Sequence, residues 1–509
     1  MRSLAVTRPG HVTARPLSGM AAYLDLPRPA PDVLVAGITH ASGEVRDGDV
    51  YAAMRGARTH GARYAADARD HGAVALLTDE DGHALTADLG LPTVVAPDPR
   101  AVLGEAAAWV YGFPARDLVL YGVTGTNGKT TVTSLLHAVL SASGPAGLVG
   151  TIETRIGARS APSVRTTPEA SDLHALLAVM REQGVRSVAL EVSSHALALG
   201  RVGGIVVDVA GFTNLSQDHL DFHADMADYF AAKARLFTPE RSRRAVVTVD
   251  DQWGRRLARQ ATVPLATLSA DPDDPDDPAV LAADWVVLEA EPHGTGSRAG
   301  LRGPDGARHE LVVGLPGMVN VANAALAVAM ADAGGVPVED ALPALARAPM
   351  VPGRMEVVGA DPLVVVDYAH SPDAVERALA TLRRTAKPPL VVVIGAGGDR
   401  DVTKRGPMGA AAARGADLVV VTDDNPRSED PADIRAAVAA GADEVDPSRV
   451  IEVPDRAEAI RVAVERAGLG TVLLAGKGHE QGQEVAGVVH PFDDRTVARA
   501  VLAERGGGP

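Results

Sequence analysis

Hydrophobic residues in the middle of the chain predict a buried strand, a loop and a helix in immediate succession. The run from Asp117 to Val123, DLVLYGV, has the length and continuous apolar character of a buried strand. The segment GTNGKTT follows as a loop, and TVTSLLHAVLSAS then has helical periodicity until Gly144 and Pro145 end it. We expect the alternation of strands and helices to continue from this unit to the PMVPGR segment near Pro349.

The region after Pro349 alternates again, with the apolar runs LVVVDYA, LVVVIGA, LVVVTDD and VLLAGKG each followed by helical segments. Such alternation predicts a parallel sheet covered by helices. Polar residues gather where these strands end. They are Asp367, Gly395 to Arg400, Asp424 to Arg427, and Gly476 to Glu480. Because open parallel sheets bind ligands at this edge, we expect a ligand site there.

The N-terminal region mixes short apolar runs with turn signals, most clearly between Gly37 and Gly61, and predicts a small α/β domain. Together with the chain length, these patterns predict an α/β protein of three domains, over residues 1–115, 116–348 and 349–509. The repetitive segment DPDDPDDP, from Asp271 to Pro278, is expected to be a solvated loop.

Composition excludes several classes of function. The chain carries 49 Lys and Arg against 65 Asp and Glu, a net charge of −16, so we expect no broad basic surface for nucleic acid. The absence of Cys excludes disulfides and thiolate chemistry, and suits a reducing cytoplasm. The N-terminal segment lacks the apolar core of a secretory signal, and no run approaches the ~20 apolar residues of a membrane span. We therefore expect a cytoplasmic protein without membrane insertion.

The strongest chemical signal is the loop between the predicted strand and helix. Glycines let backbone N–H groups close around phosphate oxygens, a lysine adds a point charge, and a threonine hydroxyl can bind Mg²⁺. The motif departs from the strict P-loop pattern, because Val123 stands where the first glycine is expected. A simple turn before a helix is the alternative interpretation. The predicted phosphate-binding residues are Gly125, Thr126, Asn127, Gly128, Lys129, Thr130 and Thr131.

Two further segments of the central region place carboxylate and imidazole groups near strand ends. SVALEVSSHAL ends a strand at Glu191, and VVDVAGFTNLSQDHLDFH ends another before Asp218, His219, Asp221 and His223. Glu191 and His219 are candidates for holding Mg²⁺ beside nucleotide phosphates, since Mg²⁺ takes few protein ligands. Zinc is the competing interpretation, but no H-E-x-x-H spacing is present. A single histidine of this kind is more often structural.

Taken together, the ordered motifs GVTGTNGKTT, EVSSHAL, FTNLSQDHLDFH, AAKARLF, GRME, VDYAHSPDA, GGDRD, TDDNPR and GKGHE resemble the Mur ligase family, most closely its MurE type. The matching motifs run from about Gly37 to Glu480. The resemblance implies an N-terminal domain for a uridine nucleotide, a central P-loop ATPase domain, and a C-terminal Rossmann-like domain for an incoming amino acid.

The resemblance also implies roles for residues around ATP. Asn320, Arg354 and Asp367 match positions at the nucleotide and its γ-phosphate, and Lys233 matches a lysine carried as a carbamate that helps hold a metal ion. Without the family, Lys233 would be read as a solvated or snorkelling lysine. The implied catalytic residues are Lys129, Glu191, His219, Lys233 and Arg354. The implied Mg²⁺ ligands are Thr130, Glu191, His219 and Lys233.

Two substrate sites follow from the same resemblance. Positions expected to contact UDP-MurNAc-L-Ala-D-Glu are Ser42, Thr166, Thr167, Ser193 and Arg201. Positions expected to contact diaminopimelate are Arg400, Asp424, Asn425, Pro426, Arg427, Gly476 and Glu480. An Arg fork suits the distal carboxylate that distinguishes diaminopimelate from lysine, and Glu480 suits its distal ammonium. The sequence departs from the family pattern at Ala41, Gly43, Arg165 and Leu199.

The expected reaction is ATP-dependent amide-bond formation through an acyl phosphate. Two alternatives stay open at this stage. A folylpolyglutamate-synthase-like ligase shares the ATPase chemistry but should lack the DNPR and GKGHE pairing and the Ser42 region. A P-loop switch protein, by contrast, would turn over ATP without a carboxylate acceptor.

Overall fold

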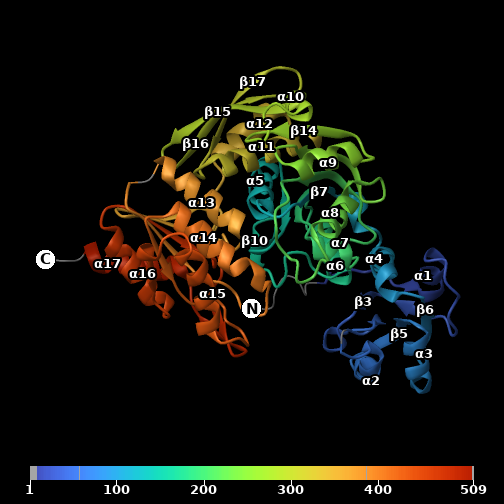
Figure 1. Cartoon of the computed structure of the whole chain (residues 1–509). Helices are drawn as coiled ribbons and strands as arrows, with labels where there is room; N and C mark the ends of the chain where they lie inside the picture. The colour runs from blue at the N-terminus through green and yellow to red at the C-terminus, as the bar shows by residue number, and fades with distance from the viewer. Residues whose placement is uncertain (1–7, 57, 386, 507–509) are drawn as a thin grey trace.

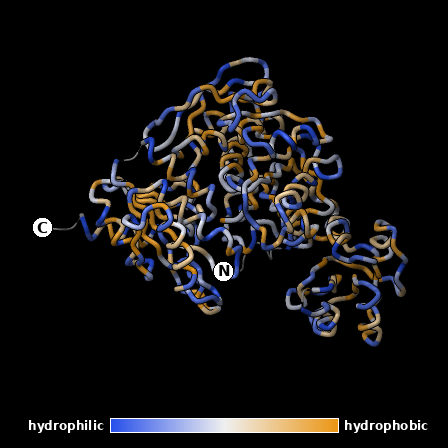
Figure 2. The backbone as a smooth tube through the Cα atoms, viewed as in Figure 1, coloured by the Kyte–Doolittle hydropathy of each residue, from blue (hydrophilic) through white to orange (hydrophobic). Residues whose placement is uncertain are grey.

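The computed structural model describes residues 8–56, 58–385 and 387–506, and within them the chain folds into three α/β units in sequence order (Figure 1). The N-terminal unit, in blue, lies apart from the C-terminal unit, in orange and red, with the central unit between them. The apolar strands run through the interior of each unit, and polar segments lie on the outside (Figure 2).

The N-terminal unit is built on a small parallel sheet of order β3-β4-β5-β6. Its last helix, α4, packs against α6 of the central unit, and the two helices share one hydrophobic cluster with the sheet. The N-terminal sheet is thereby fixed to the central unit through buried apolar side chains. The elements are β1 (Arg15–Pro16), α1 (Leu17–Tyr23), β2 (Leu34–Val35), β3 (Gly37–Thr39), β4 (Asp49–Ala53), α2 (Ala65–Asp70), β5 (Ala73–Thr78), α3 (Glu80–Leu85), β6 (Thr93–Val95) and α4 (Pro99–Val110).

The central unit contains an eleven-stranded sheet of order β10-β9-β8-β11-β7-β12-β13-β14-β15-β16-β17. Its strands from β8 to β15 are parallel, and both edges are antiparallel. Helices α5, α11 and α12 cover one face, and α6 to α9 cover the other. Alternation along β7 explains this, because Leu120 faces one cluster while Tyr121 and Val123 face the other.

The elements of the central unit begin with β7 (Val119–Thr124), α5 (Lys129–Ala142), β8 (Ala146–Val149), β9 (Glu153–Ile156), β10 (Arg159–Pro162), α6 (Ala170–Glu182), β11 (Ser187–Glu191), α7 (Ser194–Ala198), β12 (Val207–Phe212) and α8 (Met226–Ala234). They continue with β13 (Ser242–Thr248), α9 (Gln252–Gln260), β14 (Leu265–Ser269), α10 (Pro278–Leu281), β15 (Trp285–His293), β16 (Gly296–Arg302), β17 (Arg308–Val313), α11 (Met318–Ala333) and α12 (Val338–Ala346).

The C-terminal unit has a six-stranded sheet of order β18-β19-β23-β20-β21-β22, parallel except for β18, with a separate hairpin of β24 and β25. Helices α13, α14 and α15 pack on one face, and α16 and α17 on the other. The elements are β18 (Glu356–Ala360), β19 (Leu363–Asp367), α13 (Pro372–Thr385), β20 (Leu390–Ile394), α14 (Arg405–Gly415), β21 (Leu418–Val421), α15 (Pro431–Asp443), β22 (Val450–Glu452), α16 (Arg456–Ala467), β23 (Thr471–Ala475), β24 (Gly482–Val485), β25 (Val488–Pro491) and α17 (Asp494–Gly506).

The structure confirms the α/β class and corrects the expected alternation in two regions. Strands β8, β9 and β10, and likewise strands β15, β16 and β17, follow one another as antiparallel neighbours with no helix between them. They extend the parallel sheet at its two edges, where one face of an antiparallel ribbon can stay in water. In the described part of the chain, no helix is both long enough and apolar enough to span a membrane.

Candidate active site

A cavity of about 210 Å³ lies where the central and C-terminal units meet. The strand ends and helix starts predicted to carry chemistry border it from both sides, although they are far apart in the sequence. The predicted residues that line it are Thr126, Asn127, Gly128, Lys129, Thr130, Thr131, Thr166, Glu191, Ser193, His219, Lys233, Asn320, Arg354 and Asp367.

The loop between β7 and α5 has the backbone shape of a phosphate-binding loop. Gly125 and Gly128 have φ angles of +146° and +87°, which side chains with a Cβ rarely adopt. A Cβ at Gly128 would lie 2.3 Å from Oδ1 of Asn323, so the loop also packs too closely for one. Lys129 Nζ donates to the carbonyl oxygens of Gly125, at 3.0 Å, and Thr126, at 2.8 Å. Its ammonium is therefore folded over the loop, at the N-terminus of α5.

Glu191 holds together the hydroxyl groups that surround the loop. Its Oε2 accepts hydrogen bonds from Thr130 Oγ1, at 3.1 Å, and Thr151 Oγ1, at 2.9 Å, while Oε1 accepts from the Thr151 N–H at 2.7 Å. Thr166 Oγ1 lies 3.0 Å from Thr151 Oγ1. The carboxylate and these hydroxyls form a compact set of hard oxygen donors of the kind that Mg²⁺ prefers.

The C-terminal unit contributes a cation and a carboxylate to the same cavity. Arg354 Nη2 donates to Thr130 Oγ1 at 3.0 Å, and the guanidinium lies 4.5 Å from the centre of the Tyr368 ring. Asp367 Oδ2 accepts from the Met355 N–H at 2.8 Å. Burial raises the pKa of Asp367, and the Arg354 charge opposes that rise. A positive charge from the C-terminal unit thus reaches the loop of the central unit.

Lys233 is buried at this site, so its interpretation as a solvated or snorkelling lysine is wrong. Lys233 is 1% exposed, and its Nζ donates to the Gly125 carbonyl at 2.6 Å. Burial, and after it the nearby charge of Lys129, hold the pKa of Lys233 well below its ordinary value. This shift favours the neutral, nucleophilic form of the amine over its ordinary ammonium form.

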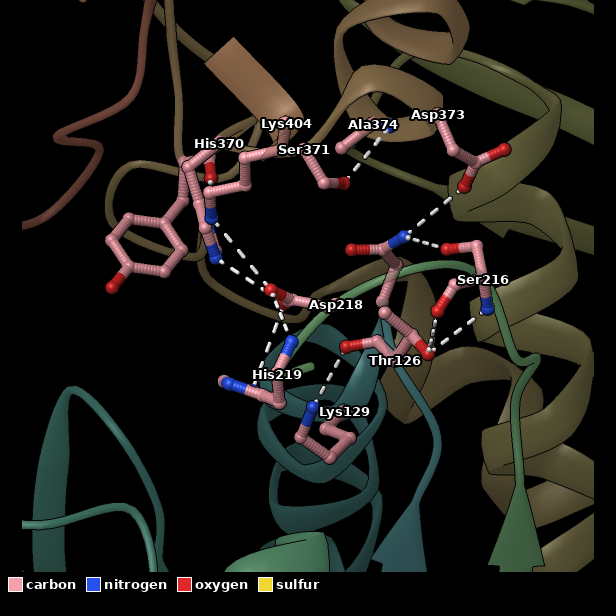
Figure 3. A network of polar contacts seen from close by, with 12 residues as sticks. Thr126, Lys129, Ser216, Asp218, His219, His370, Ser371, Asp373, Ala374 and Lys404 are labelled. Carbon is pink, nitrogen blue, oxygen red and sulfur yellow. Dashed lines mark hydrogen bonds and ion pairs between the residues drawn. The ribbon is translucent and has the colours of Figure 1, made fainter. Parts of the chain in front are cut away.

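Asp218 faces three cationic or imidazole groups, two of which, His370 and Lys404, belong to the C-terminal unit (Figure 3). Its carboxylate lies 3.6 Å from His219 Nε2, 3.6 Å from His370 Nε2 and 3.7 Å from Lys404 Nζ. Burial acts to raise the pKa of Asp218, but the hydrogen bond and charge of His370 hold it well below its ordinary value. Burial lowers the pKa of His219 to about 3, so this imidazole is neutral and able to bind a metal.

The residues expected to contact a muramoyl dipeptide divide into two places. Thr167 and Ser193 are joined to the end of β11, because Thr167 Oγ1 donates to the Glu191 carbonyl at 2.7 Å and accepts from the Ser193 N–H at 3.2 Å. Arg201 Nη1 donates to the Thr167 carbonyl at 3.3 Å. Ser42 begins a short 3-10 helix of the N-terminal unit and does not line the cavity. These residues cannot all contact one small ligand, but an extended one could reach them.

The residues expected to select the amino acid form a separate cluster in the C-terminal unit. Glu480 Oε2 accepts from Asn425 Nδ2 at 2.7 Å and from Lys477 Nζ at 3.3 Å, and Oε1 accepts from the Tyr368 hydroxyl at 3.4 Å. Tyr368 also lines the cavity, so it connects the two places. A Cβ at Gly476 would lie 2.4 Å from Asp424 Oδ2.

Arg427 lies in the same cluster and has a left-handed backbone, with φ of +53°. Its Nη1 donates to the Gly398 carbonyl at 2.6 Å, and its Nε lies 3.3 Å from Glu484 Oε2. Arg400 is exposed and follows the Gly397–Gly398 loop that Arg427 contacts, and Pro426 lies against Gly398.

Several residues at the site escaped the sequence prediction. Thr151, Asn323 and Lys404 belong to none of the recognised motifs and look like ordinary loop and helix residues in the sequence. Asp218, His370 and Lys477 stood in recognised motifs at strand ends, yet none of them had an assigned role. Proximity to a partner 152 positions away (370 − 218) is not visible in sequence spacing.

A second cavity, of about 500 Å³, adjoins the first and shares Pro316, Val319, Asn323, Arg377 and Thr381 with it. Its rim includes Asp271 and Asp273 from the acidic segment. That segment is largely exposed, as predicted, but Asp273 also accepts a hydrogen bond from Arg255 Nη1 at 2.7 Å. The segment therefore borders a cavity besides facing solvent.

Comparison with known families finds three matching models in sequence order. The description "Mur ligase family, catalytic domain" matches residues 34–111, "Mur ligase middle domain" matches 123–331, and "Mur ligase, glutamate ligase domain" matches 353–478. A relative from Streptomyces avermitilis, named UDP-N-acetylmuramoyl-L-alanyl-D-glutamate--2,6-diaminopimelate ligase, is 51% identical over 506 residues, covering 98% of this chain and 99% of its own.

Solved structures show the same similarity. A structure of a UDP-N-acetylmuramoyl-L-alanyl-D-glutamate--2,6-diaminopimelate ligase is 32% identical, with a TM-score of 0.64 over 93% of this chain and 96% of its own. A MurF ligase from Thermotoga maritima in complex with ADP shares the fold at 18% identity, with a TM-score of 0.61 over 92% of this chain and 96% of its own.

Proposed function

This chain belongs to the Mur ligase family, and we propose that it is an ATP-dependent ligase that joins 2,6-diaminopimelate to UDP-N-acetylmuramoyl-L-alanyl-D-glutamate in peptidoglycan synthesis. The observation that carries this proposal is the 51% identity, over 98% of the chain, to a relative that bears this name. The cavity between the central and C-terminal units supports it, because it combines a phosphate loop with cations from both units. A cytoplasmic location is part of the proposal.

The three units are proposed to divide the substrates among them. Residues 1–115 would bind the uridine nucleotide, 116–348 would bind ATP, and 349–509 would bind the amino acid. The three largest sheets support this division, because each is formed by strands from one of these ranges. Ser42 would contact the nucleotide end of the muramoyl substrate, while Thr166, Thr167, Ser193 and Arg201 would contact its dipeptide end. An extended substrate would be needed to reach both places, because Ser42 does not line the cavity that Thr166 and Ser193 line.

ATP is proposed to span the two adjoining cavities. Its phosphates would lie against the loop from Gly125 to Thr131, where backbone N–H groups, the α5 N-terminus and Lys129 supply positive potential. The adenosine would lie in the second cavity, which the shared residues connect to the first. Asn320 is buried in α11 at the border of the first cavity, where its amide would face the nucleotide.

The residues present fit Mg²⁺ beside the phosphates. Glu191 and Thr130 offer hard oxygen donors that already lie 3.1 Å apart, and His219 offers a neutral imidazole at the same cavity. No group of three or more His, Asp or Glu side chains in the described ranges is arranged to hold a metal ion, so phosphate and water oxygens would complete the coordination. Bound Mg²⁺ would offset the negative charge of the phosphate oxygens.

Lys233 is proposed to carry a carbamate. Burial and the nearby Lys129 charge lower the pKa of this amine, which favours the neutral form that attacks carbon dioxide. The resulting anion would lie close to the Lys129 ammonium, so the modification would add an attractive charge interaction at this place. It would also place another oxygen ligand near the phosphate loop, where Lys233 already touches Gly125.

In the first proposed step, a D-glutamyl carboxylate oxygen attacks the γ-phosphorus of ATP, and ADP leaves. The transferring phosphoryl group gathers negative oxygens between the loop and the C-terminal unit. Lys129 from the loop and Arg354 from the opposite side are placed to neutralise them. Asp367 bonds the backbone N–H next to Arg354, which helps fix the guanidinium in this position.

In the second step, an amine of diaminopimelate attacks the acyl carbon and phosphate leaves. A free carboxylate does not accept an amine at a useful rate, and the acyl phosphate supplies a leaving group. The cluster around Glu480 and Arg427 would hold the distal end of the amino acid, and Tyr368 connects this cluster to the cavity. Contact between the two units would exclude water from the acyl phosphate.

The two alternatives are less well supported. A folylpolyglutamate-synthase-like ligase should lack the DNPR and GKGHE pairing, which this structure brings together through Asn425 and Glu480. A P-loop switch needs no second cluster in the C-terminal unit and no relative of this identity with a ligase name.

The decisive experiment incubates the purified protein with ATP, UDP-MurNAc-L-Ala-D-Glu and each of a panel of amino acids, and measures product mass. The expected product is the diaminopimelate adduct, formed with ADP and phosphate. Release of ADP at an unchanged rate without the muramoyl dipeptide, and no adduct with any amino acid, would refute the ligase proposal in favour of the switch.

A further inference from the structure

We propose that Glu484, on the hairpin β24–β25, is a positioning residue that determines how strongly the enzyme binds the distal carboxylate of its amino acid. It would act through Arg427. The inference rests on the proposed function, since it concerns the amino-acid site of that reaction. It begins from an ion pair that the sequence motifs do not include, between Arg427 Nε and Glu484 Oε2 at 3.3 Å.

The hairpin first fixes the backbone of Arg427. The Arg427 N–H donates to the Glu484 carbonyl at 3.0 Å, and the Ala486 N–H donates to the Arg427 carbonyl at 2.7 Å. Asn425 Oδ1 accepts from the Glu484 N–H at 2.9 Å. Strand β24 thus pairs with the DNPR segment and holds Arg427 at a φ of +53°, which an arginine adopts only when its surroundings impose it.

The Glu484 carboxylate then fixes the guanidinium. Nε pairs with Glu484 and Nη1 donates to the Gly398 carbonyl, so two of the three nitrogens are engaged by different partners. Nη2 makes no hydrogen bond to any residue in the described part of the chain. An incoming carboxylate would therefore meet a guanidinium that is already oriented, with a nitrogen still free to donate.

Glu480 cannot replace Glu484 in this role, because its oxygens are occupied. Asn425, Lys477 and Tyr368 all donate to Glu480, and the buried Lys477 ammonium balances its charge. Glu484 is 39% exposed and has one charged partner, Arg427, which is 22% exposed. An ion pair this open to solvent contributes little to folding stability, so orientation of Arg427 is its more significant effect.

Ordering an arginine before its ligand arrives lowers the cost of binding. Immobilising one long side chain typically changes affinity by roughly three- to tenfold. Glu484→Ala should therefore raise the KM for diaminopimelate by about that factor while leaving kcat unchanged. The KM values for ATP and for the muramoyl dipeptide should stay at the wild-type level, because neither substrate touches Arg427.

The test compares steady-state kinetics of wild type, Glu484→Ala and Glu484→Gln, with all three substrates varied in turn. Glu484→Gln keeps the shape of the side chain and should show the same selective rise in KM. The matched control is Glu504→Gln, which breaks an exposed Arg–Glu pair with Arg461 on the surface of the same unit and should change nothing. Thermal melting of each variant establishes that it is folded.

An unchanged KM for diaminopimelate in both variants would overturn the proposal, as would equal rises in all three KM values. A fall in that KM would also overturn it, because Glu484 would then be competing with the substrate for Arg427. If wild type forms no diaminopimelate adduct at all, the proposed function fails instead, and the two failures are distinguished by that single measurement.

Discussion

At the scale of single residues, charge is concentrated where phosphate oxygens are proposed to gather. Lys129 and Lys233 both reach the Gly125 carbonyl, so two lysine nitrogens share one backbone oxygen. Burial lowers the pKa of each, and most strongly that of Lys233. The two lysines are therefore expected to differ in role, Lys129 as the cation and Lys233 as the reactive amine.

Lys129→Ala should reduce kcat/KM for ligation by a factor on the order of 10² to 10³, because it removes a donor aimed at the transferring phosphoryl group. The fold should survive, since the lysine packs over a loop and not in a core. The measurement is adduct formation together with thermal melting. Lys387→Ala is the control, because that lysine side chain is 76% exposed. Near-normal turnover in Lys129→Ala would remove the loop from the mechanism.

Lys233→Ala should cost about 10- to 100-fold in activity if the lysine carries a carbamate ligand. Short carboxylates such as acetate should restore part of the loss by occupying the space left behind. Lys233→Arg places a permanent positive charge there and cannot form the carbamate, so it should be impaired as well. Activity is measured with and without added acetate. Full activity in Lys233→Ala would contradict the assignment.

Arg427 should make wild type prefer diaminopimelate over lysine, but by a smaller factor than a fully desolvated arginine would give. A desolvated site with an unpaired arginine can reject the wrong ligand by ~10⁴ or more. In this structure Glu484 pairs with Arg427 and solvent reaches it, so lysine would not leave it unpaired. One charge-assisted hydrogen bond then gives a preference of roughly 10².

The measurement is kcat/KM for both amino acids on wild type and Arg427→Ala. The variant should lose most of the preference while keeping its KM for ATP, because Arg427 lies outside the phosphate cavity. Similar efficiency with lysine and diaminopimelate in wild type would refute the specificity claim and leave the ligase proposal standing.

At the scale of elements, strands and helices with a strong hydrophobic pattern were predictable from the sequence. These include the strands and the helix whose ends border the site. The apolar run ending at Val123 and the helix after Gly128 appear as β7 and α5, and the four valine- and leucine-rich runs appear as β19, β20, β21 and β23. The hairpin β24–β25 was missed, because its short, partly polar strands lack a clear alternation of apolar and polar residues. The two strands pair with each other, and β24 makes one further bridge, from Val485 to Arg427, that no local pattern reveals.

Gly128→Ala tests whether the loop shape, as well as its charge, is needed. The new Cβ would lie 2.3 Å from Asn323 Oδ1, and the left-handed backbone would cost about 1–2 kcal/mol. We expect the KM for ATP to rise at least tenfold, because either change distorts the loop. Gly335→Ala is the matched control, since Gly335 has a similar φ of +90° and open space around it.

Both variants should melt at a lower temperature than wild type, but only Gly128→Ala should change nucleotide kinetics. Kinetics varying ATP, with thermal melting of each protein, separate the two effects. An equal loss of ATP affinity in Gly335→Ala would show that general destabilisation, and not loop geometry, is responsible.

At the scale of the whole molecule, sequence predicted three units but not how they meet. The contact between α4 and α6 is apolar and looks like any other buried helix face in the sequence. At the active site, by contrast, the central and C-terminal units contact each other through individual pairs of polar side chains. Arg354 with Thr130 and Asp218 with Lys404 are examples. Such contacts depend on side chains that meet only when both units are folded, so residue patterns within either unit cannot reveal them.

Asp218→Asn should weaken the closed arrangement of these two units. The substitution keeps the shape of the side chain and removes the negative charge that faces His370 and Lys404 of the C-terminal unit and His219 of its own unit. Since Asp218 stays ionised far below neutral pH, its charge acts throughout the working pH range. Interactions of this kind couple domain positions by about 1–3 kcal/mol, so kcat/KM should fall roughly 5- to 100-fold. Small-angle X-ray scattering with a non-hydrolysable ATP analogue should show a larger radius of gyration for the variant than for wild type.

Lys404→Ala should act in the same direction as Asp218→Asn, and the double variant should be less impaired than the product of the two single losses. Asp417→Asn, which breaks an ion pair with Arg383 inside the C-terminal unit, should leave the radius unchanged. Strictly additive losses for Asp218 and Lys404, at a constant radius, would place Asp218 in local chemistry and not in the contact between the units.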